Sequence, residues 1–351
     1  MTSRPTITGH AAVRAALRDT ETYSSDLQGD ADVRDYRQIP LEVDPPSHHA
    51  YREALAPMFV KPRIESLIPN FQRNAVRILD EYETAGGGDF IRDVALNYVV
   101  ACLGDIFNRA QDVAEWMSWG AAVWEADGNG RSGDRLHEYL RRVFDEAQNS
   151  DVDDVWTFIA RLRINEQPMT FEQFMGIGSV SLAGGRDTVV KLITGSTWHL
   201  ITSSTNRAML LSGEVEMKKA IQELLRYFTP LPGMLRVPPE QQSLSDTERT
   251  PEAFTEISFL SANFDESVFA APDVIDFTRA RIPHVAFGFG PHTCIGNAIA
   301  EIETEVLLSE LVGRLDAWSL VADPEIEWTD VSGYRFPNAF HKMQCSVVSP
   351  A

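Results

Sequence analysis

Residues 287 to 296 read Phe-Gly-Phe-Gly-Pro-His-Thr-Cys-Ile-Gly, and this stretch decides the fold. Its single cysteine, Cys294, follows clustered glycines and precedes an apolar helical stretch that we expect from Ile295 to Leu311. A thiol at a helix N-terminus faces unpaired backbone N–H groups and the positive end of the helix dipole, and both lower the pKa of the thiol. We therefore expect Cys294 to be held as a thiolate.

The glycines and the first phenylalanine of this stretch favour a flat ligand beside the sulfur. Gly288, Gly290 and Gly296 allow tight turns and a close approach of a ligand to the backbone. Phe287 offers an aromatic face next to Cys294. These features suit a thiolate that serves as the axial ligand of a haem iron. The alternative is a buried structural cysteine in a glycine-rich turn, which ten residues in this order disfavour.

The stretch resembles the haem-binding signature of the cytochrome P450 family, Phe-Gly-x-Gly-x-His/Arg-x-Cys-x-Gly, with every fixed position filled. By this resemblance Cys294 is the metal ligand and binds the iron of haem b, iron protoporphyrin IX. Phe287, His292 and Gly296 then lie at cofactor-binding positions. The resemblance runs from about Thr8 to Val348 in the same order along the chain.

The resemblance implies a mostly α fold with small β-sheets, in which residues 1–351 form one cytochrome P450-like domain. Family members carry several tens of residues before a segment like Ile7 to Ser25, and these are missing here. We therefore expect the usual N-terminal helix and first strands to be lacking. Either the active site is unusually open, or another segment replaces part of the sheet, or the chain is a truncated gene product.

Composition and charge limit the partners of the protein. The chain has 351 residues, of which 44% are hydrophobic and 23% charged, which is ordinary for a globular protein. Its net charge of −20 disfavours nucleic acid and anionic membranes. No apolar stretch reaches the length of a membrane span, and Met1 to Gly9 is not a signal peptide. Three cysteines without close pairs fit a reducing cytoplasm, where we expect the protein to be.

Hydrophobic periodicity predicts mostly helices. A strand-rich stretch is expected only from Met234 to Phe277 and at the C-terminus around Cys345, and Asp127 to Gly133 reads as a glycine-rich linker that we predict to be a mobile lid. The predicted helices cover residues 11–17, the stretch after Pro46 as far as Phe59, and residues 60–83, 90–107, 113–125, 136–147, 170–200 and 218–227. A capping box, Thr170 to Gln173, opens the longest of them.

That long helix contains the sequence Ala-Gly-Gly-Arg-Asp-Thr at residues 183–188. Two adjacent glycines weaken the helical ladder and leave room for a ligand against the backbone. Thr188 follows Gly184 by four residues, so its hydroxyl can reach the Gly184 carbonyl. Asp187 beside Thr188 forms an acid and an alcohol, a pair suited to proton relay. Alone, a close helix contact is the better interpretation; beside the cysteine signature, the segment resembles the family's oxygen-activation motif, which makes Asp187 and Thr188 catalytic.

Glu223 and Arg226 are spaced i, i+3, a spacing that in isolation indicates an exposed surface ion pair. By resemblance they form the family's buried Glu-x-x-Arg pair, which is structural. The family often adds a third partner, an arginine in the loop that follows, where this chain has Val274. Arg279 or a backbone group is the expected substitute.

Further basic residues are candidates for binding the haem propionates. His48 and Arg52 are spaced i, i+4, and arginine binds carboxylates as a bidentate fork. In isolation they would be a surface basic pair. They match the family's Asp-Pro-Pro-x-His-x-x-x-Arg, whose histidine and arginine hold propionates. By the same comparison Arg236 and His284 are weaker candidates, either of which alone would be a surface residue.

We interpret the chain as a haem-thiolate monooxygenase that inserts one atom of O2 into a small to medium organic substrate, by hydroxylation or a related oxidation such as O-demethylation. Leu231 and Met234 are candidate substrate contacts. Electrons are expected from a separate ferredoxin- or flavodoxin-type donor, since the sequence has no flavin or NAD fingerprint. One alternative is oxidative coupling or peroxide-driven oxidation in natural-product biosynthesis. The non-enzymatic alternative is a haem-binding scaffold or recruiter.

Overall fold

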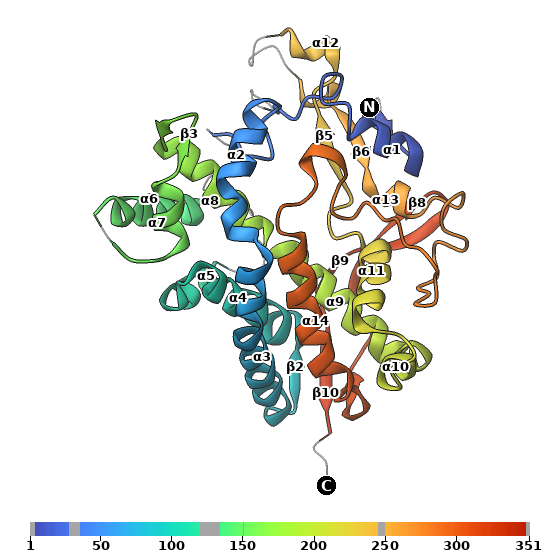
Figure 1. Ribbon diagram of the computed structural model, residues 1–351. Helices are drawn as coiled ribbons and strands as arrows, with labels where there is room; N and C mark the ends of the chain where they lie inside the picture. Colours follow the sequence, from blue (N-terminus) through green and yellow to red (C-terminus); the bar gives the residue numbers. More distant parts are fainter. Residues whose placement is uncertain (1–3, 28–35, 120–133, 150, 245–249, 349–351) are drawn as a thin grey trace.

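The computed structural model describes residues 4–27, 36–119, 134–149, 151–244 and 250–348. Helices dominate, and they surround a central pair, α9 and α14, while small sheets lie at the periphery (Figure 1). The α-helices are α1 (His10–Ala16), α2 (Ser47–Leu55), α3 (Lys61–Thr84), α4 (Asn97–Phe107), α5 (Val113–Ser118), α6 (Asp134–Gln148), α7 (Val155–Ala160), α8 (Phe171–Gly184), α9 (Asp187–Thr202), α10 (Ser204–Leu211), α11 (Met217–Phe228), α12 (Pro239–Gln242), α13 (Phe259–Asn263) and α14 (Asn297–Val312).

The strands are short and form small sheets. One three-stranded sheet has the order β1-β6-β5, with β1 parallel and β5 antiparallel to β6, and a second has the order β2-β10-β7. Two hairpins complete the set, β3–β4 and β8–β9. The strands are β1 (Thr6–Ile7), β2 (Gly87–Asp89), β3 (Arg163–Ile164), β4 (Gln167–Pro168), β5 (Gly233–Arg236), β6 (Thr255–Ser258), β7 (Trp318–Leu320), β8 (Glu325–Val331), β9 (Tyr334–Lys342) and β10 (Gln344–Val347).

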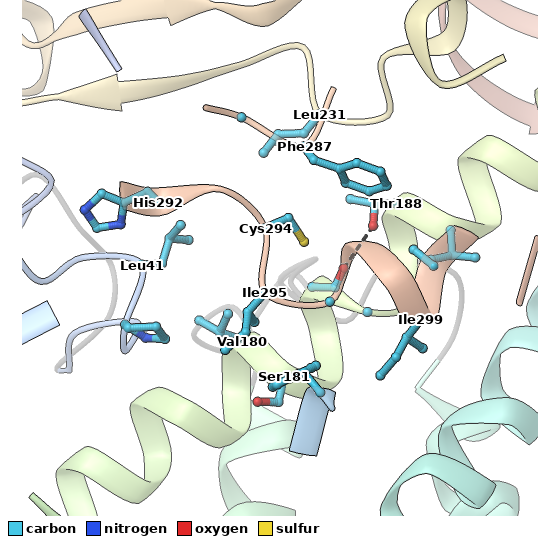
Figure 2. Close-up of a pocket in the computed structure, with 18 of the residues that line it drawn as sticks. Leu41, Val180, Ser181, Thr188, Leu231, Phe287, His292, Cys294, Ile295 and Ile299 are labelled. Atoms are coloured by element: carbon cyan, nitrogen blue, oxygen red, sulfur yellow. Dashed lines mark hydrogen bonds between the residues drawn. The ribbon is translucent and has the colours of Figure 1, made fainter. Parts of the chain in front are cut away.

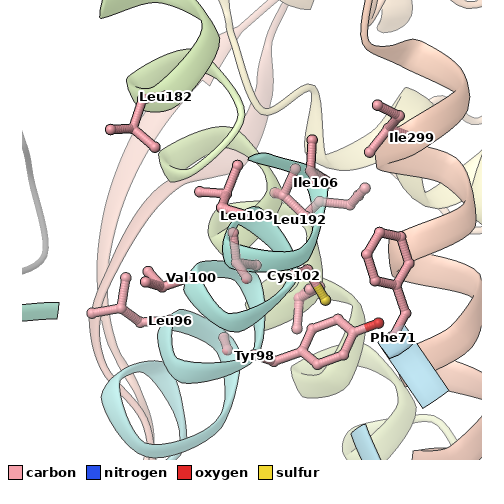
Figure 3. Close-up of a cluster of buried hydrophobic side chains, with 14 of the residues drawn as sticks. Phe71, Leu96, Tyr98, Val100, Cys102, Leu103, Ile106, Leu182, Leu192 and Ile299 are labelled. Atoms are coloured by element: carbon pink, nitrogen blue, oxygen red, sulfur yellow. The ribbon is translucent and has the colours of Figure 1, made fainter. Parts of the chain in front are cut away.

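The main hydrophobic core lies where α3, α4, α9 and α14 meet (Figure 3). Phe71 of α3, Leu103 of α4, Leu192 of α9 and Ile299 of α14 all contribute to it. The buried positions of α3 recur at helical spacing and face α14. Burial of this apolar face, more than helix propensity, holds the helices in place. Within the described residues, no helix is long and apolar enough to cross a membrane.

The mostly helical class with small sheets is confirmed, and most predicted helices appear within a few residues of their expected bounds. Cys102 and Cys345 are buried, as expected. The capping box also forms: the Gln173 N–H donates to Thr170 Oγ1 over 3.3 Å, and the Thr170 N–H donates to Gln173 Oε1 over 3.0 Å. The predicted lid from Asp127 to Gly133 lies outside the described residues.

Two expectations about secondary structure were wrong. The long helix does not continue from residue 170 to 200; α8 ends at Gly184 and α9 begins at Asp187, because the glycine pair weakens the ladder and Arg186 departs from helical geometry with φ −100° and ψ −69°. The stretch from Met234 to Phe277 is not rich in strands. Its described part contains β5 and β6 together with the helices α12 and α13, and two-residue strands such as β1 and β3 appear elsewhere because they are too short for periodicity to reveal.

A buried ion-pair network fixes α11 to the loop that follows α13. Glu223 and Arg226 are both fully buried, and two N–H groups of Arg226 donate to the carboxylate over 2.7 and 2.8 Å. Arg226 also donates to the carbonyls of Pro272, over 2.7 Å, and Asn263, over 3.0 Å. Arg279 fills the place left by Val274, since its Nε lies 2.9 Å from Glu223 Oε1. The pair is therefore structural rather than a surface bridge.

We predict that Arg226→Ala lowers the free energy of unfolding by about 3–5 kcal/mol, because it removes one of the two cations that offset the buried Glu223 charge and the donor to three carbonyls, those of Asn263, Pro272 and Val274. Arg77→Ala is the matched control, since Arg77 forms an exposed i, i+4 pair with Glu81. We expect that control to change the unfolding free energy by less than about 0.5 kcal/mol. Chemical denaturation measures both, and equal stability of the two variants would show that the network contributes nothing.

Candidate functional site

The candidate site is an apolar cavity bounded by α8, α9, α14 and the loops that precede β5 and α14 (Figure 2). All of the residues predicted for the site line it, except Asp187 and His284. Segments far apart in the sequence therefore meet as expected around Cys294. The predicted residues that line the cavity are His48, Arg52, Gly184, Thr188, Leu231, Met234, Arg236, Phe287, His292, Cys294 and Gly296.

The loop that carries Cys294 is a tight turn that only glycine permits at two positions. Gly288 and Gly290 have φ of +70° and +76°, in the left-handed region that residues with a Cβ avoid. A Cβ on Gly290 would also lie 2.7 Å from the Leu17 carbonyl oxygen. The turn is closed by the Cys294 N–H, which donates to the Phe287 carbonyl over 2.8 Å. This backbone presents the sulfur to the cavity.

The pKa of the Cys294 thiol differs from the predicted one. Its surface is open to the cavity, yet protein atoms surround it, and this burial raises its pKa above the usual value. The N–H of Gly296 and the charge of Arg52 act in the opposite direction without reversing the shift. The prediction that the helix N-terminus lowers the pKa was therefore wrong for the protein alone, because α14 begins only at Asn297 and the surroundings are apolar. A bound cation that ligates the sulfur would itself deprotonate it.

Arg236, Arg52 and His48 line the cavity in positions where burial makes their charge costly. Burial lowers the pKa of Arg236 to about 10, and Asp44 is the acid that offsets this. Arg52 donates to the Thr293 carbonyl over 2.8 Å, next to Cys294. His48 is 1% exposed, and neither ring nitrogen has a hydrogen-bond partner among the described residues. Buried polar groups usually have partners, so this arrangement fits a ligand that brings carboxylates to the cavity.

Two other predicted histidines behave differently from each other. The ring of His292 lies 4.1 Å from that of His48, and its Nε2 lies 3.1 Å from Ser25 Oγ. Burial, followed by the nearby His48 and Arg236, lowers the pKa of His292 to about 3, so the ring is neutral. His284 points away from the cavity: its Nε2 lies 3.0 Å from Gln222 Oε1, and its Nδ1 accepts the Ala286 N–H. Because both ring nitrogens of His284 have protein partners, its predicted contact with a propionate finds no support here.

The break between α8 and α9 forms one wall of the cavity. The Thr188 hydroxyl donates to the Gly184 carbonyl over 2.9 Å, which confirms the predicted contact (Figure 2). Asp187 does not line the cavity; its side chain is 34% exposed, and its Oδ1 lies 3.6 Å from Nη1 of the buried Arg186. Thr188 therefore lines the cavity, while Asp187, also in the first turn of α9, is partly exposed and does not line it.

Sequence reasoning missed several residues of the cavity wall. Glu303 lines the cavity from α14, and complete burial raises its pKa well above the usual value. The signal for it was available, since Gly296, Ile299, Ala300 and Glu303 follow helical spacing from the cysteine. Val180 and Ser181 of α8 also line the cavity, and nothing in their sequence context marked them.

Comparisons with known proteins place this geometry in a family. The sequence profile described as Cytochrome P450 matches residues 216–326. The chain is 28% identical over 333 residues to pentalenic acid synthase of Streptomyces avermitilis, which covers 90% of this chain and 82% of the relative. It is 25% identical over 332 residues to steroid C26-monooxygenase of Mycolicibacterium smegmatis, which covers 91% and 82%.

A solved structure described as that of a carbohydrate active P450 has the same fold. It matches with a TM-score of 0.86 and 28% identity, over 97% of this chain and 91% of that chain. The agreement therefore extends over nearly the whole chain and is not confined to the cysteine loop. The chain therefore has the cytochrome P450 fold, and its sequence resembles cytochrome P450 proteins over most of its length.

Proposed function

We propose that the cavity binds haem b, with Cys294 as its axial ligand. The observation that carries this assignment is the combination of one cysteine sulfur open to an apolar cavity and buried basic side chains on the same wall. A porphyrin is flat and apolar, apart from two carboxylates at one edge. The apolar wall matches its faces, and the basic side chains match its carboxylates.

The residues that would hold the propionates are Arg52, Arg236 and His48, and the ring of His292 packs against that of His48 at a tilt of 48°. Arg236 has the strongest case, because the residue is only 3% exposed and a carboxylate partner would compensate the cost of burying its charge. His48 would donate a ring N–H, because neither of its nitrogens has a partner among the described residues. His284 is left out, since Gln222 already occupies its Nε2.

The bound haem supplies O2 binding and one-electron chemistry, and the protein supplies positioning and protons. Leu231 and Met234 would contact the substrate, together with Val180 of α8. These side chains are apolar, which favours a small to medium organic substrate with an apolar surface at the oxidised position. We propose hydroxylation or a related oxidation such as O-demethylation as the reaction.

Proton delivery is proposed to run through the first turn of α9. The Thr188 hydroxyl faces the cavity and is oriented by its bond to Gly184. Asp187 is in partial contact with solvent, so it can take up a proton and pass it toward the cavity. This division of roles requires both residues, because Asp187 does not itself reach the cavity.

Electrons are proposed to come from a separate donor of the ferredoxin or flavodoxin type, because the sequence contains no fingerprint for flavin or NAD. We also propose a single domain over residues 1–351 and a cytoplasmic location. The unpaired Cys102, Cys294 and Cys345 support a reducing compartment.

We predict that Cys294→Ser abolishes the red-shifted Soret band that thiolate-ligated haem shows when reduced under carbon monoxide. The reason is that a serine hydroxyl stays protonated and is a poor ligand for iron. Cys102→Ser, a change of a buried cysteine away from the iron, is the control and should keep the band. Retention of the band in Cys294→Ser would contradict the assignment.

We predict that Thr188→Ala keeps O2 and reductant consumption within about threefold of the parent but loses most of the product and releases hydrogen peroxide instead. Without the hydroxyl, the proton no longer reaches the required oxygen atom, an effect of about 10²-fold for a positioned acid–base group. Thr188→Ser restores the hydroxyl and should restore product. Product, peroxide and reductant are measured together with a reductase pair.

Asp187→Asn separates the two roles. It should slow the whole cycle without raising the share of peroxide, because the supply of protons fails before their direction does. If Thr188→Ala forms product as efficiently as the parent, the relay lies elsewhere. If the parent forms product only with added peroxide, the peroxide-driven alternative holds and the electron donor is unnecessary.

A further inference from the structure

Lys191 of α9 is a partly buried lysine whose ammonium contacts the carbonyl of another segment. Burial lowers the pKa of its ammonium to about 8, and Glu327 of β8 is the charge that offsets the shift. By contrast, the side chains of Lys61 and Lys218 are 83% and 75% exposed. Lys191 is therefore held closer to the body of the protein than these two lysines are.

The ammonium of Lys191 is directed at one carbonyl. Its Nζ donates to the Pro230 carbonyl over 3.2 Å, and it lies 5.5 Å from the centroid of the Phe336 ring. Pro230 follows the end of α11, where Thr229 adopts a left-handed conformation with φ +31° and ψ 72°. The chain leaves the helix sharply at this point, so the Pro230 carbonyl cannot be paired within the helix.

The loop that Lys191 holds forms part of the cavity wall. Pro230, Leu231 and Met234 line the cavity, and Leu231 is 40% exposed (Figure 2). The loop is fixed on either side of this point as well. The Asn263 side chain donates to Thr229 Oγ1 over 2.9 Å, and the Leu260 N–H donates to the Pro232 carbonyl over 2.8 Å. Lys191 supplies the tether between these two anchors, directly beside Leu231.

Lys191 also connects this loop to the helix that carries the proposed proton relay. It follows Thr188 by three residues on α9. One rigid helix therefore fixes the position of the Thr188 hydroxyl and of the loop that Lys191 contacts. We propose that Lys191 is a positioning residue that fixes the Thr229–Gly233 loop, and that it thereby sets how tightly the enzyme holds molecules that touch Leu231 and Met234. This inference rests on the proposed haem site.

The test compares two probes whose nitrogen binds the haem iron. Imidazole is too small to need the loop, whereas the phenyl ring of 4-phenylimidazole extends into the apolar space that Leu231 borders. Lys191→Met keeps the length of the side chain but removes the hydrogen-bond donor to Pro230. The untethered loop is then more mobile, and binding of the larger probe has to order it at a cost in conformational entropy. We expect the Kd for 4-phenylimidazole to rise about 5- to 10-fold, with imidazole changed less than about 2-fold.

Lys218→Met is the matched control, because Lys218 lies exposed on α11, and it should change neither Kd. A double-mutant cycle with Leu231→Ala shows whether Lys191 acts through the loop. In the Leu231→Ala background, Lys191→Met should change the Kd for 4-phenylimidazole by less than about 2-fold, since coupled residues are not additive. Additive effects, or an equal loss for both probes, would overturn the proposal.

Two further readings keep the test decisive. Hydrogen exchange of the Leu231 and Gly233 amides should accelerate in Lys191→Met, whereas exchange unchanged from the parent would overturn the proposal. Should the Met variant fail to retain haem, Lys191→Gln, with its shorter reach to Pro230, is expected to change the Kd in the same direction. If the parent itself lacks the red-shifted Soret band and binds neither probe, the haem site is wrong, which is a different failure from that of the loop tether.

Discussion

The buried bond between Glu223 and Arg226 is the interaction on which the cavity depends. Arg226 ties α11 to the carbonyls of Asn263 and Pro272, and Arg279 adds a second cation to the same carboxylate. The end of α11 begins the loop with Leu231, and the side chain of Asn263 accepts the Val285 N–H just before the cysteine loop. One network thus sets the positions of two cavity walls. An ion pair without solvent tolerates little displacement, since each lost contact leaves a charge uncompensated.

The cavity combines polar groups that are individually unfavourable in apolar surroundings. Burial raises the pKa of Cys294 and lowers the pKa values of His48 and Arg52, so the protein alone favours the neutral thiol and a neutral imidazole. An iron cation would stabilise the thiolate form of Cys294, and two carboxylates would stabilise the charged forms of the basic side chains. The unfavourable electrostatics of the site is therefore consistent with a cofactor that completes it.

The sequence predicted which residues form the site better than it predicted their orientations and pKa values. The cysteine loop, the bond from Thr188 to Gly184 and the helical class follow from local patterns, and the structure has them. The orientation of His284 did not follow, because it depends on Gln222, 62 residues away in the sequence. Arg279 and a backbone group were both expected as substitutes for the missing arginine at Val274, and both are present: Arg279 Nε and the Asp276 N–H donate to Glu223 Oε1 over 2.9 and 3.0 Å. The pKa of Cys294 was misjudged because burial by distant segments outweighs the local helix terminus.

The interruption between α8 and α9 connects these observations. A continuous helix would pair the Gly184 carbonyl with the N–H of residue 188, whereas here the Thr188 hydroxyl bonds to that carbonyl over 2.9 Å. The break also starts α9 afresh at Asp187, whose carboxylate is stabilised by the helix dipole in the first turn. From this start the spacing of α9 is fixed, so Lys191 reaches Pro230 while Thr188 faces the cavity. The glycine pair therefore determines where α9 begins. That start places Thr188 at the cavity for proton delivery and, about one turn later, Lys191 against the loop that contains Leu231.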